Sequence, residues 1–292
     1  MGLLGRGSGT VVYSVTDGRG QQAALKTCEP DSTAWSRGAL ARRLHREASA
    51  LRLVGGRGVV RLREDGSDTD RPYLVLELVE GPTLAALVAR HGGLRADRVA
   101  RLGVLLCRTI GELHARGVTH GDLKPANIIC HSDGPVLIDL DAATLVSAGP
   151  GRRGFPGPFR RVAGVLAHTV PGLENAGGAS AGDDDTIDMR VRATPAWIAP
   201  EVAAGGDGGA PADVFGLAAV LVNANSGRAP FGRGPAAVLL ERVRTRDPDV
   251  RGVAPELRQI LLAALDRRPQ CRPSATEFAL TLGAGASDRM AA

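Results

Sequence analysis

The sequence contains almost no lysine, few aromatic residues and no closely spaced cysteines. Of its 292 residues 34 are arginines, and the two lysines are Lys26 and Lys124. Aromatic residues make up 3% of the chain, so leucine, valine and alanine must fill its core. The four cysteines form no C-x-x-C pair, which disfavours a zinc site or a disulfide framework and fits a reducing, cytoplasmic location.

Two further absences exclude classes of partner. No apolar run approaches the roughly 20 residues of a membrane helix, and no charged-then-apolar signal segment opens the chain. We therefore expect no membrane span in this chain. The formal net charge is +5, but the arginines are scattered rather than gathered in a stripe. We therefore expect no nucleic-acid partner.

Hydrophobic periodicity differs between the first 80 residues and the rest. Short apolar runs predict strands at 11–15, 23–26 and 73–79, and helical spacing predicts a helix over 36–54. From Thr83 onward helical spacing dominates. The helices predicted there cover 97–116, 213–225, 235–246 and 255–266. The chain is thus expected to be β-rich at its start and helical afterwards.

Two segments have the composition of loops. Residues 147–185 contain nine glycines, four prolines and an acidic run at 183–185, which predicts a mobile insertion covering about 147–190. The tail is small and polar, and we expect residues 285–292 to be disordered. Only three residues precede Leu4, so the first strand looks clipped and the native start is expected upstream.

Both lysines stand in patterns typical of phosphate chemistry. Lys26 ends the apolar run 23–26, and Lys124 lies in His-Gly-Asp-Leu-Lys-Pro-Ala-Asn at 120–127. Arginine's planar fork does not replace lysine's compact charge in a tight phosphate site. Survival by drift is the alternative explanation. A buried lysine needs a partner anion, and Glu47 is the candidate unless it is simply a solvated side chain on its helix.

A glycine-rich turn precedes the first predicted strand. Glycine lets backbone N–H groups approach phosphate oxygens, and Gly5, Gly7 and Gly9 provide such positions. A plain β-hairpin turn has the same composition, and Thr10 stands where strict G-x-G-x-x-G has its third glycine. A strand rather than a helix follows, which excludes a Rossmann dinucleotide site.

The segment 120–127 is the most specific feature. Asp122 can orient a substrate hydroxyl and accept its proton, and Lys124 can neutralise a moving phosphoryl group. Asn127 can offer its amide oxygen to Mg²⁺. Asp139 follows a predicted strand at 136–138 and can complete the metal site.

In this order the motifs resemble the catalytic domain of a eukaryotic-type (Hanks-type) bacterial serine/threonine protein kinase, over nearly the whole chain. The resemblance implies a bilobal α+β fold, with a kinase domain over 1–284, an N-lobe to about 79, a hinge near 77–82 and a C-lobe over about 83–284. It implies ATP and Mg²⁺ as cofactors. The implied ATP-site residues are Gly5, Gly7, Gly9, Val12, Ala24, Lys26, Glu47, Glu77, Val79 and Asp139. The implied catalytic residues are Asp122, Lys124 and Asn127, and the implied metal ligands are Asn127 and Asp139.

Later motifs extend the resemblance, and three departures stand out. The segments 194–201, 213–217, 227–231 and 272–274 match the family's helical half, in which Arg272 would pair with Glu201. Gly121 replaces the arginine of H-R-D, which grips an activation-segment phosphate in the family. Asp141 and Leu140 replace the Gly and Phe of D-F-G. The segment from Asp139 to Glu201 spans 63 residues because of the insertion.

The resemblance implies Mg-ATP-dependent phosphorylation of Ser or Thr hydroxyls on protein substrates. Lys124, two residues after Asp122, resembles the Ser/Thr pattern rather than the tyrosine kinase pattern. Two alternatives remain. H-G-D-L-x-x-x-N and the stretch 138–143 also resemble small-molecule phosphotransferases of the aminoglycoside type. A catalytically inactive binding module (a pseudokinase) is the other alternative.

Overall fold

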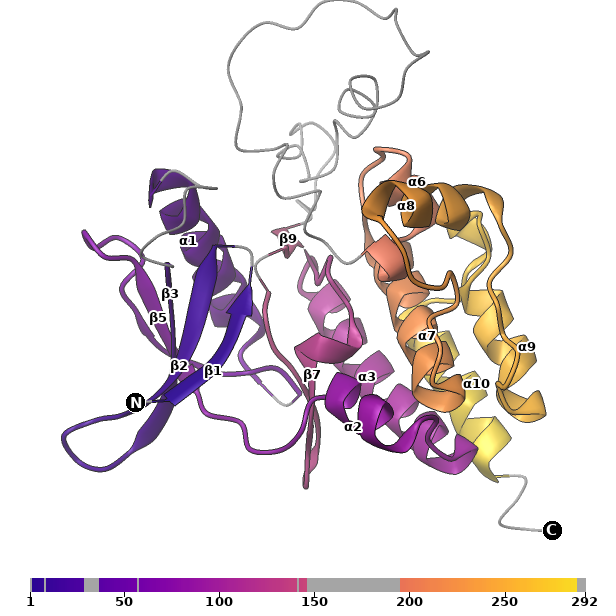
Figure 1. Ribbon diagram of the computed structural model, residues 1–292, viewed down its shortest axis with the longest axis horizontal. Coiled ribbons are helices and arrows are strands. Elements are labelled where there is room, and N and C mark those ends of the chain that lie inside the picture. Colours follow the sequence, from indigo (N-terminus) through magenta and orange to yellow (C-terminus); the bar gives the residue numbers. More distant parts are fainter. Residues whose placement is uncertain are drawn as a thin grey trace, which may run out of the picture.

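A computed structural model of the chain describes residues 2–7, 9–28, 37–56, 58–140, 142–145 and 195–287. The predicted insertion at 147–190 and the last five residues lie outside these ranges. The described chain forms a β-sheet lobe followed by a helical lobe (Figure 1), which is the predicted bilobal α+β arrangement. Among the described residues, no helix has both the length and the apolar character needed to cross a membrane.

The first lobe is built on one antiparallel sheet with strand order β1-β2-β3-β5-β4. These strands are β1 (Gly2–Gly7), β2 (Thr10–Thr16), β3 (Gln22–Cys28), β4 (Leu62–Asp65) and β5 (Tyr73–Glu77). Because β3 is the central strand, its middle is shielded by neighbours on both edges. Ala24 and Lys26 are therefore buried, although only one of them is apolar.

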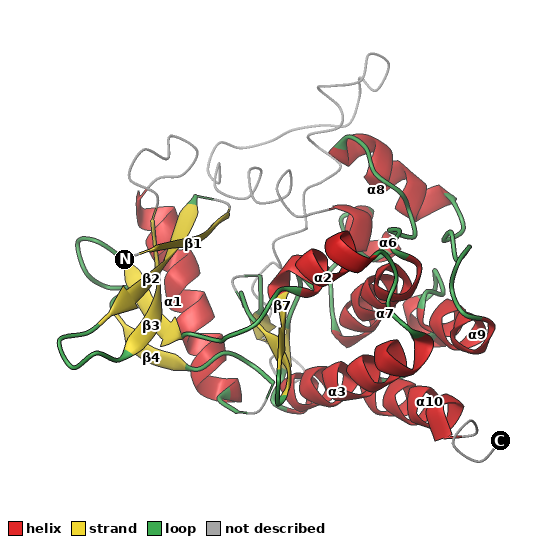
Figure 2. Cartoon of the chain, turned by 60° about the horizontal axis from the view of Figure 1, so that its bottom comes forward, coloured by secondary structure: helices red, strands yellow, loops and turns green. Residues whose placement is uncertain are grey.

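Helix α1 (Arg37–Val54) lies against the sheet (Figure 2). Its apolar residues recur at helical spacing, and Leu44, Ala48 and Leu51 are buried. Glu47 lies three residues after Leu44 and four before Leu51, so it shares their buried face. The spacing that makes the helix amphipathic thus directs a carboxylate into the lobe's interior.

The chain crosses to the helical lobe after β5 and enters α2 (Leu84–His91). The hydroxyl of Thr83 accepts a hydrogen bond from the Ala86 N–H at 3.1 Å, which caps the helix start, and Gly92 ends it at φ 73°. Helix α3 (Ala96–Ala115) follows. Four short strands come next: β6 (Val118–Thr119) pairs with β9 (Thr144–Leu145), and β7 (Ile128–His131) pairs with β8 (Gly134–Leu137).

The remaining helices pack around α7 (Ala210–Ser226), which is apolar on nearly every side and therefore lies in the lobe's centre. Figure 2 shows α7 among the other helices of this lobe. The others are α6 (Pro200–Ala203), α8 (Ala236–Thr245), α9 (Pro255–Ala264) and α10 (Ala275–Ser287), with 3₁₀ turns η1 (Pro125–Asn127), η2 (Pro195–Trp197) and η3 (Pro269–Cys271).

The predicted elements are present with small shifts, and several others were not predicted. The strand expected over 73–79 ends at Glu77, where the chain leaves the sheet. The unpredicted elements are the strands β4, β6, β7 and β9, the helices α2, α6 and α10, and the three 3₁₀ turns. Helix α10 has a capping box in which Ser274 and Glu277 bond each other's backbone N–H groups. It continues to Ser287, past the expected tail start at 285, although Gly283 and Gly285 disfavour helix.

Candidate active site

Lys26 is the centre of a buried charge cluster between the two lobes. Its Nζ lies 2.7 Å from Glu47 Oε2 and 2.6 Å from Asp139 Oδ1. The side chains of Lys26 and Glu47 are 5% and 0% exposed. Burying a charge is costly unless it is paired, and here one ammonium group meets two carboxylates. The pairing of Lys26 with Glu47 expected from the sequence is present. Together with the Asp139 contact, it joins β3 to α1 and to the segment after β8.

Asp139 has a backbone conformation that few residues adopt. It is the one non-glycine residue with positive φ in the described part of the chain, at 71°. Aspartate tolerates this left-handed region better than bulkier residues, and such strain gathers at functional sites. Burial by itself raises the pKa of Asp139, but the Lys26 ammonium, helped by Lys124 and His120, lowers it from 3.8 to about 2. The group is therefore a carboxylate at neutral pH.

The loop between β6 and β7 gathers the three predicted catalytic residues. Lys124 Nζ contacts Asp122 Oδ2 directly. Asn127 donates its side-chain amide to the Asp122 carbonyl oxygen at 3.0 Å and to Asp122 Oδ2 at 3.3 Å. Because the amide nitrogen makes both bonds, the amide oxygen of Asn127 is the atom suited to face a cation. The 3₁₀ turn η1 brings Asn127 back toward Asp122.

A network missed by the sequence analysis holds this loop. The buried carboxylate of Asp213, at the start of α7, accepts hydrogen bonds from the N–H groups of His120 at 2.8 Å and Gly121 at 2.9 Å. His114 Nε2, from α3, lies 2.9 Å from the same carboxylate. The motif at 213–217 places Asp213 near a helix start, but nothing in the sequence links it to His114, 99 residues earlier. The one signal in the sequence for a structural role of Asp213 is its charge at the start of an otherwise apolar helix.

Gly121 occupies a position that only glycine fits. Its φ is +76°, and a Cβ there would lie 2.6 Å from the Ala142 carbonyl oxygen. The replacement of the H-R-D arginine is therefore part of the loop's backbone geometry. Leu140 is completely buried, as expected for an apolar contact at the middle of D-F-G. Asp141 lies outside the described residues.

The glycine-rich turn connects to the cluster through the sheet. Gly5 and Gly7 lie in β1, and Gly9 follows with φ 80°. Strand β1 pairs with β2, in which Val12 lies directly opposite Lys26. Ser8 lies outside the described residues, so the glycines are joined to Lys26 by strand pairing rather than by a described side-chain contact.

The predicted hinge lies next to Ala24 and the β7 strand. Ala24 pairs with Leu76 across the sheet, and the Glu77 N–H donates to the Arg61 carbonyl at 2.9 Å. Val79 is partly buried against the core. Beyond it, Thr83 bridges to Ile129, which places Ile129 beside the hinge. Ile129 was not predicted as a hinge neighbour, because its short strand resembles any apolar run.

A second buried ion pair anchors the helical lobe. Arg272 makes a two-point contact with Glu201, at 2.7 and 2.8 Å, which is the pairing that the resemblance implied. The guanidinium also lies 4.9 Å from the ring centroid of Phe215 and donates to the Asp266 carbonyl at 2.7 Å. This pair ties the segment after η2 to the end of the domain.

The donor set suits magnesium shared with a phosphate. Asp139 offers an ionised oxygen and Asn127 an amide oxygen, both hard ligands of the kind that Mg²⁺ uses. Among the described residues, no three His, Cys, Asp or Glu side chains form a metal-binding group. A cation held by two protein oxygens would therefore need further oxygens from phosphates and water, which is how Mg²⁺ binds in nucleotide sites.

Known proteins are similar in sequence to this chain over most of its length. The profile of the protein kinase domain family matches residues 1–163. The probable serine/threonine-protein kinase PkwA of Thermomonospora curvata is 26% identical over 242 residues, which are 81% of this chain and 27% of PkwA. The serine/threonine-protein kinase AfsK of Streptomyces coelicolor is 27% identical over 296 residues, covering 99% of this chain and 32% of AfsK. The serine/threonine-protein kinase Pkn1 of Myxococcus xanthus is 30% identical over 275 residues, covering 92% and 35%. The chain spans about a quarter to a third of the length of these relatives.

Proposed function

The chain belongs to the protein kinase domain family, and from this premise we propose that it transfers the γ-phosphoryl group of Mg-ATP to Ser or Thr hydroxyls of protein substrates. The observation that carries the proposal is the bridge from Lys26 to both Glu47 and Asp139. A buried ammonium between two carboxylates, above a loop with an Asp, a Lys and an Asn, is a site organised for polyphosphate and metal rather than for covalent catalysis.

The ATP side of the site would use the sheet lobe. Glu47 fixes the position of Lys26, whose compact charge would contact the α- and β-phosphates. Gly5, Gly7 and Gly9 would let backbone N–H groups cover the phosphates. Val12 and Ala24 would contact the adenine ring, and Glu77 and Val79 would bind its polar edge. Asp139 and Asn127 would hold magnesium, which neutralises charge on the phosphates when bound.

The protein-substrate side would use the catalytic loop. Asp122 is oriented by Asn127 and Lys124 and would accept the proton of the attacking hydroxyl. Lys124 touches that carboxylate now and would move to the transferred phosphoryl group as negative charge develops there. Asp213 would keep the loop's backbone in place during this change.

The remaining parts of the proposal concern boundaries and setting. We propose one kinase domain over 1–284, with a small lobe to about 79, a hinge near 77–82 and a large lobe over about 83–284. The partners would be proteins with Ser or Thr acceptors, with no nucleic acid involved. The free cysteines support a cytoplasmic location.

Radiolabelled ATP turnover separates the candidate functions. The protein is assayed with Mg²⁺ and a generic basic protein, with an aminoglycoside panel, and with nothing added. Label on Ser and Thr of the protein substrate, identified by acid hydrolysis, supports the proposal. Label on aminoglycosides alone would favour the small-molecule alternative, and no turnover in any arm would favour the pseudokinase alternative.

Asp122→Asn provides the internal control for this assay. It should remove turnover while ATP binding survives, because the base is lost and the nucleotide site is not. The matched substitution Asp133→Asn changes an exposed aspartate in the β7–β8 turn and should leave turnover unchanged. Full activity of Asp122→Asn would overturn its assignment as the base.

A further inference from the structure

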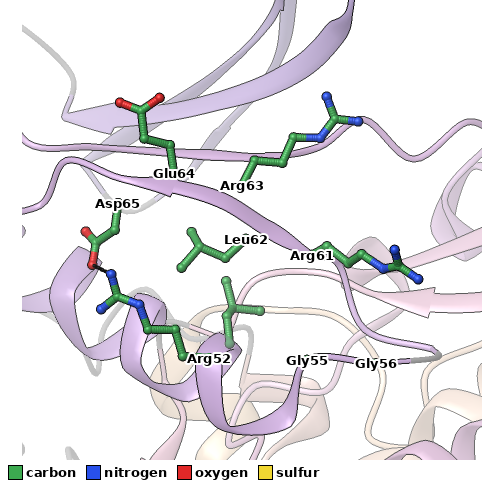
Figure 3. A pocket seen from close by; sticks show the side chains of 9 residues that line it. Arg52, Gly55, Gly56, Arg61, Leu62, Arg63, Glu64 and Asp65 are labelled. Carbon is green, nitrogen blue, oxygen red and sulfur yellow. Dashed lines mark ion pairs between the residues drawn. The ribbon is translucent and has the colours of Figure 1, made fainter.

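A groove outside the candidate active site lies between the end of α1 and the edge strand β4. Its volume is about 450 Å³. Figure 3 shows its two walls, with α1 and the following Gly55 and Gly56 on one side and β4 on the other. None of its lining residues belongs to the ATP or catalytic set described above. The groove therefore needs an explanation of its own.

The base of the groove is apolar and one wall is a strand edge. Leu51 and Leu62 are the two apolar side chains among its lining residues. Strand β4 is the last strand in the sheet order, with β5 as its one neighbour among the described strands. An edge strand can pair its backbone with an added extended segment, while a pocket takes one of that segment's side chains. This geometry suits a peptide with one apolar anchor.

The charged residues that line the groove determine which residues could flank the apolar anchor of such a peptide. At one end Arg52 and Asp65 neutralise each other, with Nη2 and Oδ2 2.8 Å apart. Glu64 accepts a hydrogen bond from the Tyr73 hydroxyl at 2.5 Å. Arg61 and Arg63 extend at the other end of the groove (Figure 3).

These two arginines are exposed and are less closely paired with a carboxylate than Arg52 is. The side chain of Arg61 is 71% exposed, and the Glu77 carboxylate is 3.9 Å from it. Arg63 donates to a neutral acceptor, the Gln22 carbonyl, at 2.7 Å. Guanidinium groups bind carboxylates in a two-point geometry. The groove is thus complementary to an acidic segment rather than a basic one.

We propose that this groove docks an extended acidic segment of a partner protein, with one apolar side chain between Leu51 and Leu62 and flanking carboxylates on Arg61 and Arg63. The segment would pair with β4 and lie against the end of α1. Glu47 is one helical turn before Leu51 on the same helix, so an occupant would bear directly on the helix that positions Lys26.

The test uses a defined probe and needs no catalysis. The probe is a fluorescein-labelled peptide with a central leucine flanked on each side by two glutamates, titrated into the full chain at low salt and followed by anisotropy. Arg61→Glu combined with Arg63→Glu should weaken binding at least roughly tenfold. The control Arg90→Glu with Arg108→Glu makes the same charge change at exposed positions on α2 and α3 and should alter binding less than about twofold.

Two further readouts locate the bound probe. Peptide should slow backbone hydrogen exchange over Leu62–Asp65, and replacing its leucine with glycine should weaken it. Melting curves check that each variant is folded. Because ATP turnover is not measured, the result is independent of the proposed kinase activity.

Three outcomes would overturn the proposal. The first is equal binding of a peptide whose glutamates are replaced by lysines, and the second is equal loss in the groove and control variants. The third is a change in the chain's sedimentation on reversal of Arg61 and Arg63 without an effect on peptide binding. That result would make the groove a surface for a second copy of the chain.

Discussion

The two lysines illustrate two ways of holding a charge. Lys26 is buried, and its partners come from α1 and from the segment after β8, 21 and 113 residues away in sequence. Lys124 is 19% exposed, and its partner Asp122 is two residues away and 14% exposed. The contacts of Lys26 form only when distant elements are packed together, whereas the contact of Lys124 with Asp122 forms within one loop. A position fixed by distant elements suits a permanent phosphate contact, whereas a local pair can exchange partners as charge moves.

Replacing each lysine with arginine should give the largest difference in turnover between the two sites. Lys26→Arg should lower kcat by roughly 10²–10³-fold, as for loss of one preorganised donor, because the wider guanidinium does not fit between Glu47 and Asp139. Lys124→Arg should lose less, since its loop is partly open. Initial rates with saturating Mg-ATP measure both. Near-normal turnover by Lys26→Arg would contradict the assignment of Lys26.

The Asp122–Lys124 pair depends on the backbone conformation of its loop. Substitutions at two glycines, Gly121 in this loop and Gly92 elsewhere, test this dependence. Gly121 and Gly92 both have positive φ, at 76° and 73°, but a Cβ meets Ala142 only at Gly121 and meets nothing within 4 Å at Gly92. Alanine at either position costs about 1 kcal/mol of backbone strain. Gly121→Ala should lose a further ~1–3 kcal/mol from overlap, and activity with it.

Urea unfolding of both glycine variants gives the two free energies. Gly92→Ala is the control, because Gly92 also has positive φ and a Cβ added there would meet nothing within 4 Å. Equal losses at the two positions would show that the loop yields to the added methyl group and that Gly121 is not required by its surroundings.

The Lys26–Asp139 contact should also make the stability of the protein depend on pH in the acid range. The folded-state pKa of Asp139 is lowered from 3.8 to about 2, so its contribution to stability is complete above pH 4 and is lost as the pH falls toward 2. The free energy of unfolding of the wild type should therefore fall more steeply over this range than that of Asp139→Asn. Parallel pH profiles for the two proteins would mean that the Lys26–Asp139 contact does not stabilise the fold.

The smallest effect is expected from phosphorylation of the activation segment. Gly121 removes the arginine that would receive such a phosphate, and the partly buried Asp122–Lys124 pair is already formed without one. Enzyme expressed with a phosphatase and shown by mass spectrometry to be unmodified should be active at once. The threonines that we expect as phosphorylation sites are Thr186 and Thr194, and both lie outside the described residues. A lag removed by pre-incubation with ATP, or a large loss in Thr186→Ala, would show phospho-control.

The sequence predicted what short-range patterns encode. Helical spacing located α1 and its Glu47, and motif order indicated that Lys26 and Asp139 serve one site. It did not predict β4, because Leu-Arg-Glu-Asp has no apolar alternation and becomes a strand only by pairing with β5. It also missed the contact of His114 with Asp213, which requires α3 and α7 to be packed together.

The central claim is that Asp139 and Asn127 complete a magnesium-dependent ATP site around Lys26. Thermal unfolding with ATP tests it directly, because any ligand of the native state raises the melting temperature. ATP with Mg²⁺ should raise the Tm of the wild type clearly more than ATP with EDTA, and Asp139→Ala should lose this magnesium-dependent part. Equal stabilisation of the wild type with and without Mg²⁺ would contradict the claim.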